Sequence, residues 1–120
     1  MDSFKLKATI IADAEVVGDG IAISVFEGNH KNVQILTSQA ADELLNIQGI
    51  RASFVVGSSD DGLSVISARS LGGINVQTIM EKMGGGGHLA TAGAQVKKSV
   101  EETVDELKEL LREINKNGGL

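Results

Sequence analysis

The sequence predicts an α/β fold in a single domain: a mixed β-sheet of about five strands with helices packed on it, ending in a C-terminal amphipathic helix. Short β-rich runs alternate along the chain with helical patterns, and turn residues separate them. The last stretch carries an apolar stripe at helical spacing. With 120 residues, of which 42% are hydrophobic, the chain is long enough for one domain with a core of its own.

Five runs rich in β-branched and other apolar residues are predicted to be strands. In chain order they are 10–17, 21–26, 51–56, 63–68 and 94–98. Gly18-Asp19-Gly20 joins the first two, because these residues tolerate the positive φ that a tight hairpin requires. A polar loop is expected over 27–32. Residues 57–62 have turn chemistry throughout, so they are expected to join the third strand to the fourth.

Three helices are predicted, and each has a polar residue that can cap its first turn. Thr37 or Ser38 caps the first and Asn75 the second. Ser99 with Glu102 forms a capping-box pattern at the start of the last helix, which has the clearest apolar stripe of the three. The predicted helices are about 38–47, 75–83 and 99–116.

The composition argues against several classes of function. The chain has no cysteine, so disulfides and thiolate chemistry are excluded. Eleven basic against sixteen acidic side chains give a net charge of −5, the wrong sign for extensive binding to a phosphate backbone. Three Phe are the only aromatic residues, which argues against a base-stacking platform. His30 and His88 have no carboxylates beside them at ligand spacing, so no histidine-based metal centre is expected.

The densest chemical signal is a run of four glycines, Gly84-Gly85-Gly86-Gly87, followed by His88. Four consecutive glycines cost much backbone entropy. One reason to keep them is ligand binding, because without a Cβ the main chain can approach a ligand and successive N–H groups can point at an anion. A helix that started near His88 would add its own N–H groups, and the imidazole could donate a hydrogen bond or carry a proton. A flexible linker is the alternative interpretation.

A second group of candidate residues lies at the end of the predicted strand 63–68. Arg69 could bind a phosphate through two parallel hydrogen bonds, and Ser67 or Ser70 could add a hydroxyl. Asn75 is predicted first as a helix cap, although a cap beside a ligand can also contact it. The alternative for Arg69 is a surface arginine at a strand end.

These residues resemble the C-terminal, DHH-associated domain of the DHH phosphoesterase family, and the resemblance covers about residues 8–96. The motifs that carry it are Ser67-Ala68-Arg69-Ser70, Gly73-Ile74-Asn75-Val76, Gly84-Gly85-Gly86-Gly87-His88 and Ala92-Gly93. Residues 40–45 and 76–82 are most similar to the membrane-anchored cyclic di-AMP phosphodiesterases of Firmicutes, the GdpP/YybT type.

The resemblance implies a division of labour between domains. In this family a preceding domain with an Asp-His-His motif holds two Mn²⁺ ions and activates the attacking water, and the DHH-associated domain closes over the substrate. The resemblance assigns nucleotide and phosphate contacts to Gly85, Gly86, Gly87 and His88, and a phosphate contact to Arg69. This sequence lacks the Asp-His-His motif. No catalytic residue, no metal site and no hydrolysis are therefore expected of this chain alone.

Residues 1–120 are thus expected to be the substrate-binding C-terminal fragment of a larger manganese-dependent phosphodiesterase that hydrolyses cyclic di-AMP to pApA. The predicted substrate-binding residues are Arg69, Ser70, Asn75, Gly85, Gly86, Gly87 and His88. The expected partners are a nucleotide or cyclic dinucleotide and the preceding DHH domain of the same polypeptide, with a homodimer left open. No secretory signal or membrane-spanning helix is found in the sequence, so no direct membrane contact is expected. A cytoplasmic location is implied, with an anchored parent left open.

Three alternatives remain at this stage. The first keeps the domain but places it in an oligoribonuclease with pAp phosphatase activity or in an exopolyphosphatase-like enzyme. The second is a stand-alone nucleic-acid-binding module, similar to the C-terminal domain of alanyl-tRNA synthetase, against which the acidic balance argues. The third is a purely structural dimerisation domain.

Overall fold

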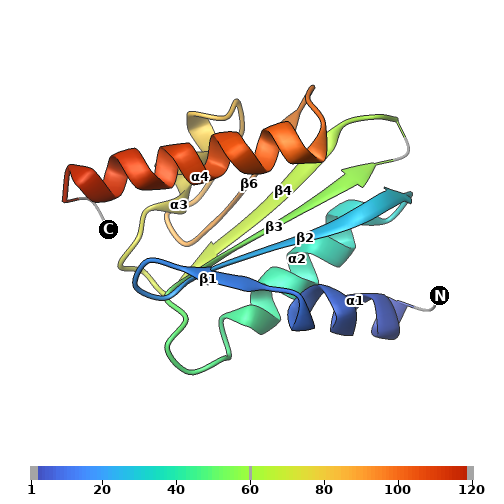
Figure 1. Cartoon of the computed structure of the whole chain (residues 1–120), viewed down its shortest axis with the longest axis horizontal. Helices are drawn as coiled ribbons and strands as arrows, with labels where there is room; N and C mark the ends of the chain where they lie inside the picture. The colour runs from blue at the N-terminus through green and yellow to red at the C-terminus, as the bar shows by residue number, and fades with distance from the viewer. Residues whose placement is uncertain (1–2, 60, 119–120) are drawn as a thin grey trace.

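Six strands form one mixed sheet with four helices on its two faces, in a computed structural model that describes residues 3–59 and 61–118 (Figure 1). The elements in chain order are α1 (Ser3–Ala12), β1 (Glu15–Val17), β2 (Ile21–His30), α2 (Val33–Leu44), β3 (Ala52–Ser59), β4 (Ser64–Ser70), α3 (Val76–Glu81), β5 (Gly86–Gly87), β6 (Thr91–Val96) and α4 (Val100–Lys116). The predicted fold class is confirmed, with one strand more than expected.

The strand order is β1-β2-β3-β4-β6-β5, which makes β5 an edge strand beside β6. Only β2 and β3 pair in parallel, and α2 provides the crossover between them. The other neighbours are antiparallel. Two distant parts of the sequence, β4 and the glycine run that contains β5, therefore lie on either side of β6 at one side of the sheet.

The sheet has a hydrophobic core on each face. Successive residues of a strand point to opposite faces, so Phe54 packs under α3 and α4 while Val55 packs under α1 and α2. Helix α2 lies mainly against β3 and β4, whereas α3 packs against β6 and β5 on the other face. The face of β6 and β5 on the α2 side is consequently the less covered part of the sheet.

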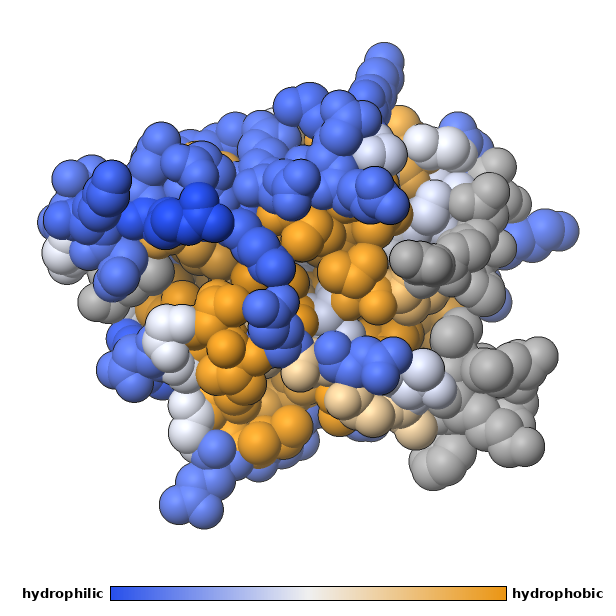
Figure 2. All heavy atoms as spheres, viewed as in Figure 1, coloured by the Kyte–Doolittle hydropathy of each residue, from blue (hydrophilic) through white to orange (hydrophobic). Residues whose placement is uncertain are grey.

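The C-terminal helix α4 confirms the sequence prediction in detail. The Ser99 side chain accepts a hydrogen bond from the Glu102 N–H at 3.1 Å, as a capping residue does. Thr103, Leu107 and Leu111 are buried against the sheet. Figure 2 shows the hydrophilic outer surface of α4 with apolar side chains gathered beneath it. In the part of the chain that the structure describes, no helix is both long and apolar enough to cross a membrane.

The prediction of a strand over 10–17 is wrong for its first half. Residues up to Ala12 belong to helix α1, and only Glu15–Val17 form a strand. Ile10 is fully buried in the core under α2, and its carbonyl accepts a hydrogen bond from the Ser24 hydroxyl of β2. A short apolar run does not distinguish a strand from a buried helix turn, so tertiary packing decided this segment.

Helix α2 begins earlier than predicted. It spans Val33–Leu44 rather than 38–47, because Val33 and Leu36 are buried in the core on this face. The predicted cap Thr37 is instead a buried residue inside the helix. The polar loop expected over 27–32 is also wrong, since the backbone of β2 continues to His30. The side chains of residues 27–30 lie outside the described part of the structure.

Two further elements differ from the prediction at the glycine-rich side of the sheet. The strand predicted over 94–98 is β6 and starts earlier, at Thr91. The two-residue strand β5 was not predicted, because glycines have low strand propensity and its pairing depends on β6. The predicted helix cap is confirmed: the Asn75 side chain accepts a hydrogen bond from the Thr78 N–H at 3.1 Å.

The connection between β3 and β4 is a polar turn, as predicted, although β3 extends further into it than expected, to Ser59. Strand β4 begins at Ser64, one residue after its predicted start, and continues to Ser70. The Asp61 carboxylate accepts hydrogen bonds from the Ser59 hydroxyl and the Leu63 N–H. The bond from Ser59, followed by that from Leu63, holds the pKa of Asp61 below its ordinary value of 3.8. Asp61 therefore acts as a turn former here.

Candidate functional site

A cavity of about 660 Å³ lies on the less covered part of the sheet, between α2, β4, β6 and the glycine run. It is lined by Arg69, Gly84–Gly87 and His88 among others, so the structure brings together the two groups of candidate residues that the sequence separates. Ser70 and Asn75 do not line it. We take this cavity as the candidate site.

Arg69 and His88 face the same side of the sheet, one on each side of Thr91. Arg69 pairs with Thr91 across β4 and β6. The backbones of His88 and Thr91 exchange two hydrogen bonds, His88 N–H to Thr91 O at 2.6 Å and Thr91 N–H to His88 O at 3.3 Å. Residues directly opposite in a ladder share a face, so Arg69 and His88 stand about 10 Å apart, two interstrand spacings. A ligand of nucleotide size can lie between them.

The neighbouring row across the same strands has almost no side chains. Ser67 of β4 pairs with Gly93 of β6, which pairs with Gly86 of β5. A Cβ built on Gly86 would have no heavy atom within 4 Å. Packing within the chain therefore does not require glycine at this position, and main chain forms the floor of the cavity.

The other glycines of the run are required by the fold. A Cβ on Gly85 would lie 2.0 Å from the Gly93 carbonyl oxygen, and one on Gly87 would lie 2.5 Å from the Ala92 Cα. Gly84 and Gly87 also have positive φ, +87° and +144°. The run is thus part of a close contact between two strands, and a flexible linker is not what the structure shows.

Most N–H groups of the run already have partners. Those of Gly84 and Gly85 bond to the carbonyls of Glu81 and Met80, at 3.1 and 2.8 Å. Because bonded and non-bonded pairs alternate along an antiparallel ladder, the N–H of Gly87 is the one that turns away from β6, outward at the sheet edge. The expectation that successive N–H groups point at an anion is therefore wrong for this structure.

No helix begins near His88. Residues 88–91 form the turn of the β5–β6 hairpin, closed by the hydrogen bonds between His88 and Thr91. The Ala92–Ala94 segment pairs with β4 as part of the sheet. Because its backbone is extended, it supplies no free N–H groups of a helix N-terminus. The His88 side chain is exposed at this turn and borders the cavity.

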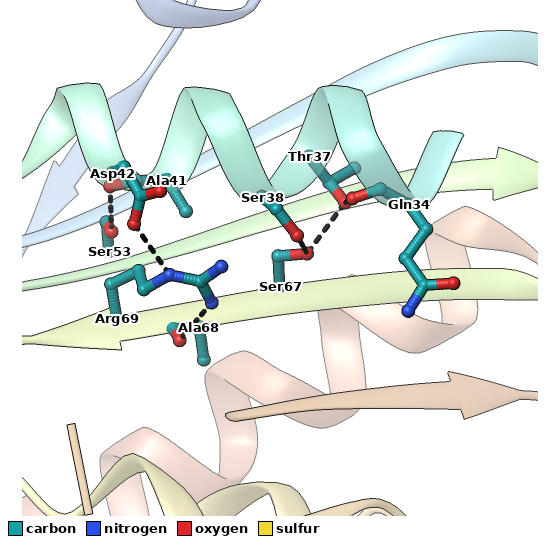
Figure 3. Close-up of polar contacts among 9 residues, drawn as sticks. All are labelled: Gln34, Thr37, Ser38, Ala41, Asp42, Ser53, Ser67, Ala68 and Arg69. Carbon is teal, nitrogen blue, oxygen red and sulfur yellow. Dashed lines mark hydrogen bonds and ion pairs between the residues drawn. The ribbon is translucent and has the colours of Figure 1, made fainter. Parts of the chain in front are cut away.

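Arg69 is held in place by the protein (Figure 3). Its Nε donates to Asp42 Oδ1 of α2 at 2.7 Å, and its Nη1 donates to the Ala68 carbonyl at 2.9 Å. The side chain is only 13% exposed. This geometry differs from that of a free surface arginine, the alternative that the sequence left open.

Ser67 lies beside the cavity but is engaged in a buried hydroxyl chain (Figure 3). The Thr37 hydroxyl donates to the Gln34 carbonyl, and the Thr37 and Ser67 oxygens are 2.7 Å apart. Thr37 has one hydroxyl hydrogen, so Ser67 is the donor in their bond. Ser38 lies 3.2 Å from Ser67 and completes the chain. Ser67 therefore has no hydrogen left for a ligand.

Ser70 and Asn75, both predicted to bind substrate, have structural partners instead. Ser70 follows Arg69 in the strand, so its side chain points to the opposite face, where it is buried. Its hydroxyl accepts hydrogen bonds from the N–H groups of Gly72 and Ile74, at 3.0 and 3.4 Å. Asn75 caps α3. Both residues shape the turn after β4.

The sequence reasoning missed the contribution of α2. Gln34 and Ser38 line the cavity, and Asp42 holds Arg69. Their spacing of four residues places them on one helix face, and this polar stripe could have been found from the sequence. It was missed because the helix was predicted to start at Ser38.

A second cavity of about 300 Å³ lies between the β1–β2 hairpin and α4. Three cations line it, and each already has an acidic partner: Arg51 pairs with Asp19 at 3.6 Å, Lys108 with Glu15 at 2.9 Å and Arg112 with Glu109 at 2.5 Å. None of the predicted site residues lines it. Within residues 3–59 and 61–118, no group of three or more His, Cys, Asp or Glu could hold a metal ion.

Comparison with known proteins identifies the family. Residues 18–117 match the family model of the DHHA1 domain. The chain is 47% identical over 107 residues to cyclic-di-AMP phosphodiesterase GdpP of Geobacillus thermodenitrificans, and 40% identical over 121 residues to GdpP of Bacillus subtilis. These alignments cover 89% and 98% of this chain but only 16% and 18% of the relatives, so the chain spans less than a fifth of their length.

The fold is shared with solved structures of low sequence identity. An exopolyphosphatase-related protein from Bacteroides fragilis superposes with a TM-score of 0.80 at 19% identity, over 93% of this chain and 34% of that one. At that identity the likeness concerns the fold alone. The family model, by contrast, covers most of the sequence, and the resemblance noted from the motifs is confirmed. This chain belongs to the DHHA1 domain family.

Proposed function

We propose that this chain is the substrate-binding domain of a manganese-dependent phosphodiesterase that hydrolyses cyclic di-AMP to pApA. The names of the GdpP relatives support the reaction, and the small share of their length that the chain spans supports a role as one domain of a larger enzyme. The cavity supports the role in binding, since it combines a fixed guanidinium, an exposed imidazole and a floor without side chains.

The single observation that carries the proposal is the position of Gly86. Its neighbours in the run are glycines because β6 leaves no room for a Cβ, but Gly86 faces open space in the cavity. A Cβ there would therefore obstruct only a bound ligand. Arg69 and His88, at the two ends of the neighbouring cross-strand row, would donate hydrogen bonds to phosphate oxygens.

The described residues do not fit a manganese centre, because none of them form a cluster of three acidic or histidine ligands. The proposal therefore places the metal ions and the activation of water in the preceding DHH domain, and gives this chain the tasks of binding and orienting the substrate.

The isolated chain is expected to bind cyclic di-AMP without cleaving it. With Mn²⁺ added, chromatography of the reaction mixture should show intact cyclic di-AMP and no pApA after prolonged incubation. Hydrolysis of cyclic di-AMP by the purified chain that is abolished by His88→Ala would contradict the assignment of the chemistry to another domain.

Gly86→Ala is expected to weaken cyclic di-AMP binding by about tenfold, the loss of about 1.4 kcal/mol of binding free energy. The stability of the fold should be unchanged or raised by up to about 1 kcal/mol, because the new Cβ meets nothing in the protein and φ is ordinary. Titration of the ¹⁵N-labelled protein followed by amide shifts gives the affinity, and thermal unfolding gives the stability.

The matched control is Gly73→Ala. Gly73 also has an ordinary φ, and a Cβ there would lie 3.8 Å from an Arg51 nitrogen, an ordinary contact. It does not line the cavity, so Gly73→Ala should bind as the wild type does. Equal affinities for all three proteins would reject the cavity as the binding site. Tighter binding of tripolyphosphate than of cyclic di-AMP would favour the exopolyphosphatase-like alternative.

A further inference from the structure

We propose that Asp42 of α2 is a positioning residue for Arg69, and that its charge simultaneously weakens the binding of anionic ligands. The proposal rests on the proposed function, in which Arg69 holds a phosphate. It assigns two separable effects to one carboxylate: a hydrogen bond that orients the guanidinium, and a negative charge beside the place that a phosphate would occupy.

The hydrogen bonds of Arg69 leave one edge of the guanidinium available. A guanidinium has five N–H donors. Nε uses one on Asp42, and Nη1 uses one on the Ala68 carbonyl, so three remain, two of them on Nη2. Among residues 3–59 and 61–118, none accepts a hydrogen bond from these three. These remaining N–H groups can donate hydrogen bonds to two oxygens of one phosphate, and Arg69 lines the cavity in which such a ligand would lie.

The position of Asp42 follows from the packing of α2 on the sheet. Gln34, Ser38 and Asp42 recur every four residues along the helix, and the last two lie over Ser67 and Arg69 of β4 (Figure 3). The pair is asymmetric in exposure. The Arg69 side chain is 13% exposed, whereas that of Asp42 is 62% exposed. Asp42 can therefore be changed with little effect on the core, while it fixes a side chain that is mostly enclosed.

Holding Arg69 in advance lowers the cost of binding. An arginine loses considerable rotamer freedom when a ligand immobilises it, and a pre-ordered side chain has already lost that freedom. The same carboxylate repels a phosphate, because like charges at a partly solvated surface still interact. The hydrogen bond and the charge thus act on ligand affinity in opposite directions.

Two substitutions separate these effects. Asp42→Asn keeps an oxygen that accepts the Nε hydrogen bond but removes the charge, so cyclic di-AMP should bind about two- to threefold more tightly. Asp42→Ala removes both. Since the loss of ordering exceeds the gain from the charge, it should bind about two- to tenfold more weakly than wild type. Glu43→Gln is the matched control, because it removes one charge from the next residue of α2, whose partner is Lys7. Its affinity should not change.

A signal that does not depend on the ligand tests the positioning directly. The Arg69 Nε–H resonance should be observable in wild type, Asp42→Asn and Glu43→Gln, where the proton is hydrogen-bonded, and should be lost by exchange with water in Asp42→Ala. A structural role alone would change thermal stability without this pattern of Nε–H signals and opposite affinity shifts.

The proposal is overturned if Asp42→Asn and Asp42→Ala shift the affinity in the same direction, or if the Nε–H signal persists in Asp42→Ala. Should wild type bind no cyclic di-AMP at all, the proposed function fails by itself. The Nε–H signal then still decides the positioning, and inorganic phosphate replaces the dinucleotide as the probe for the opposite shifts.

Discussion

Gly85→Ala is expected to destabilise the fold by about 3 kcal/mol, the upper range for forcing extra volume into a packed contact. The new Cβ would lie 2.0 Å from the Gly93 carbonyl oxygen and 2.7 Å from the Ala94 Cα, both of them backbone atoms of β6. Neither can move without breaking the pairing of β6 with β4. Denaturant unfolding followed by circular dichroism measures the loss.

Gly86→Ala is the control for this prediction, since it adds the same methyl group one residue later. Its stability should match or slightly exceed that of wild type, for the reason given above. Substitutions at two adjacent glycines should therefore have different effects: Gly85→Ala should lower the stability of the fold, and Gly86→Ala should lower the affinity for the ligand. A Gly85→Ala protein as stable as wild type would show that β5 does not pack on β6 as closely as described.

Arg69→Ala is expected to weaken cyclic di-AMP binding by about ten- to a hundredfold. The estimate follows from hydrogen bonds to a charged group, which contribute about 1.5–3 kcal/mol each. The substitution removes the only cation that lines the cavity among the described residues, with histidine counted as neutral. Isothermal titration calorimetry at moderate salt measures the affinity, and the amide spectrum verifies that the variant is folded.

Arg112→Ala is the control for general electrostatics. It removes the same charge from α4, where the side chain is 66% exposed and pairs with Glu109, away from the cavity. Its affinity should stay within about twofold of wild type, because screening limits the effect of a distant surface charge. An equal loss in both variants would mean that binding depends on net charge rather than on the site.

The features that could be predicted from the sequence are those with local causes. The Ser99 cap and the buried stripe of α4 follow from spacing within one helix, and the structure confirms both. The Asn75 cap is another such case. Arg69 and His88 were selected as candidate binding residues because a strand end and a glycine run mark places where side chains or main chain can reach a ligand. The structure places both on one cavity, and their role in binding stays a prediction.

The features that needed the tertiary structure depend on contacts between distant residues. Residues of α1 were assigned to a strand because the pattern of a short apolar run does not show what will bury Ile10. Which glycines the fold requires depends on the cross-strand register. This register places Gly85 and Gly87 against β6, whereas a Cβ on Gly86 would meet no other atom. The contact of Asp42 with Arg69 joins residues 27 apart, and only the packing of α2 on β4 creates it. Periodicity and capping are properties of neighbours along the chain, whereas a binding surface is a property of neighbours across the sheet.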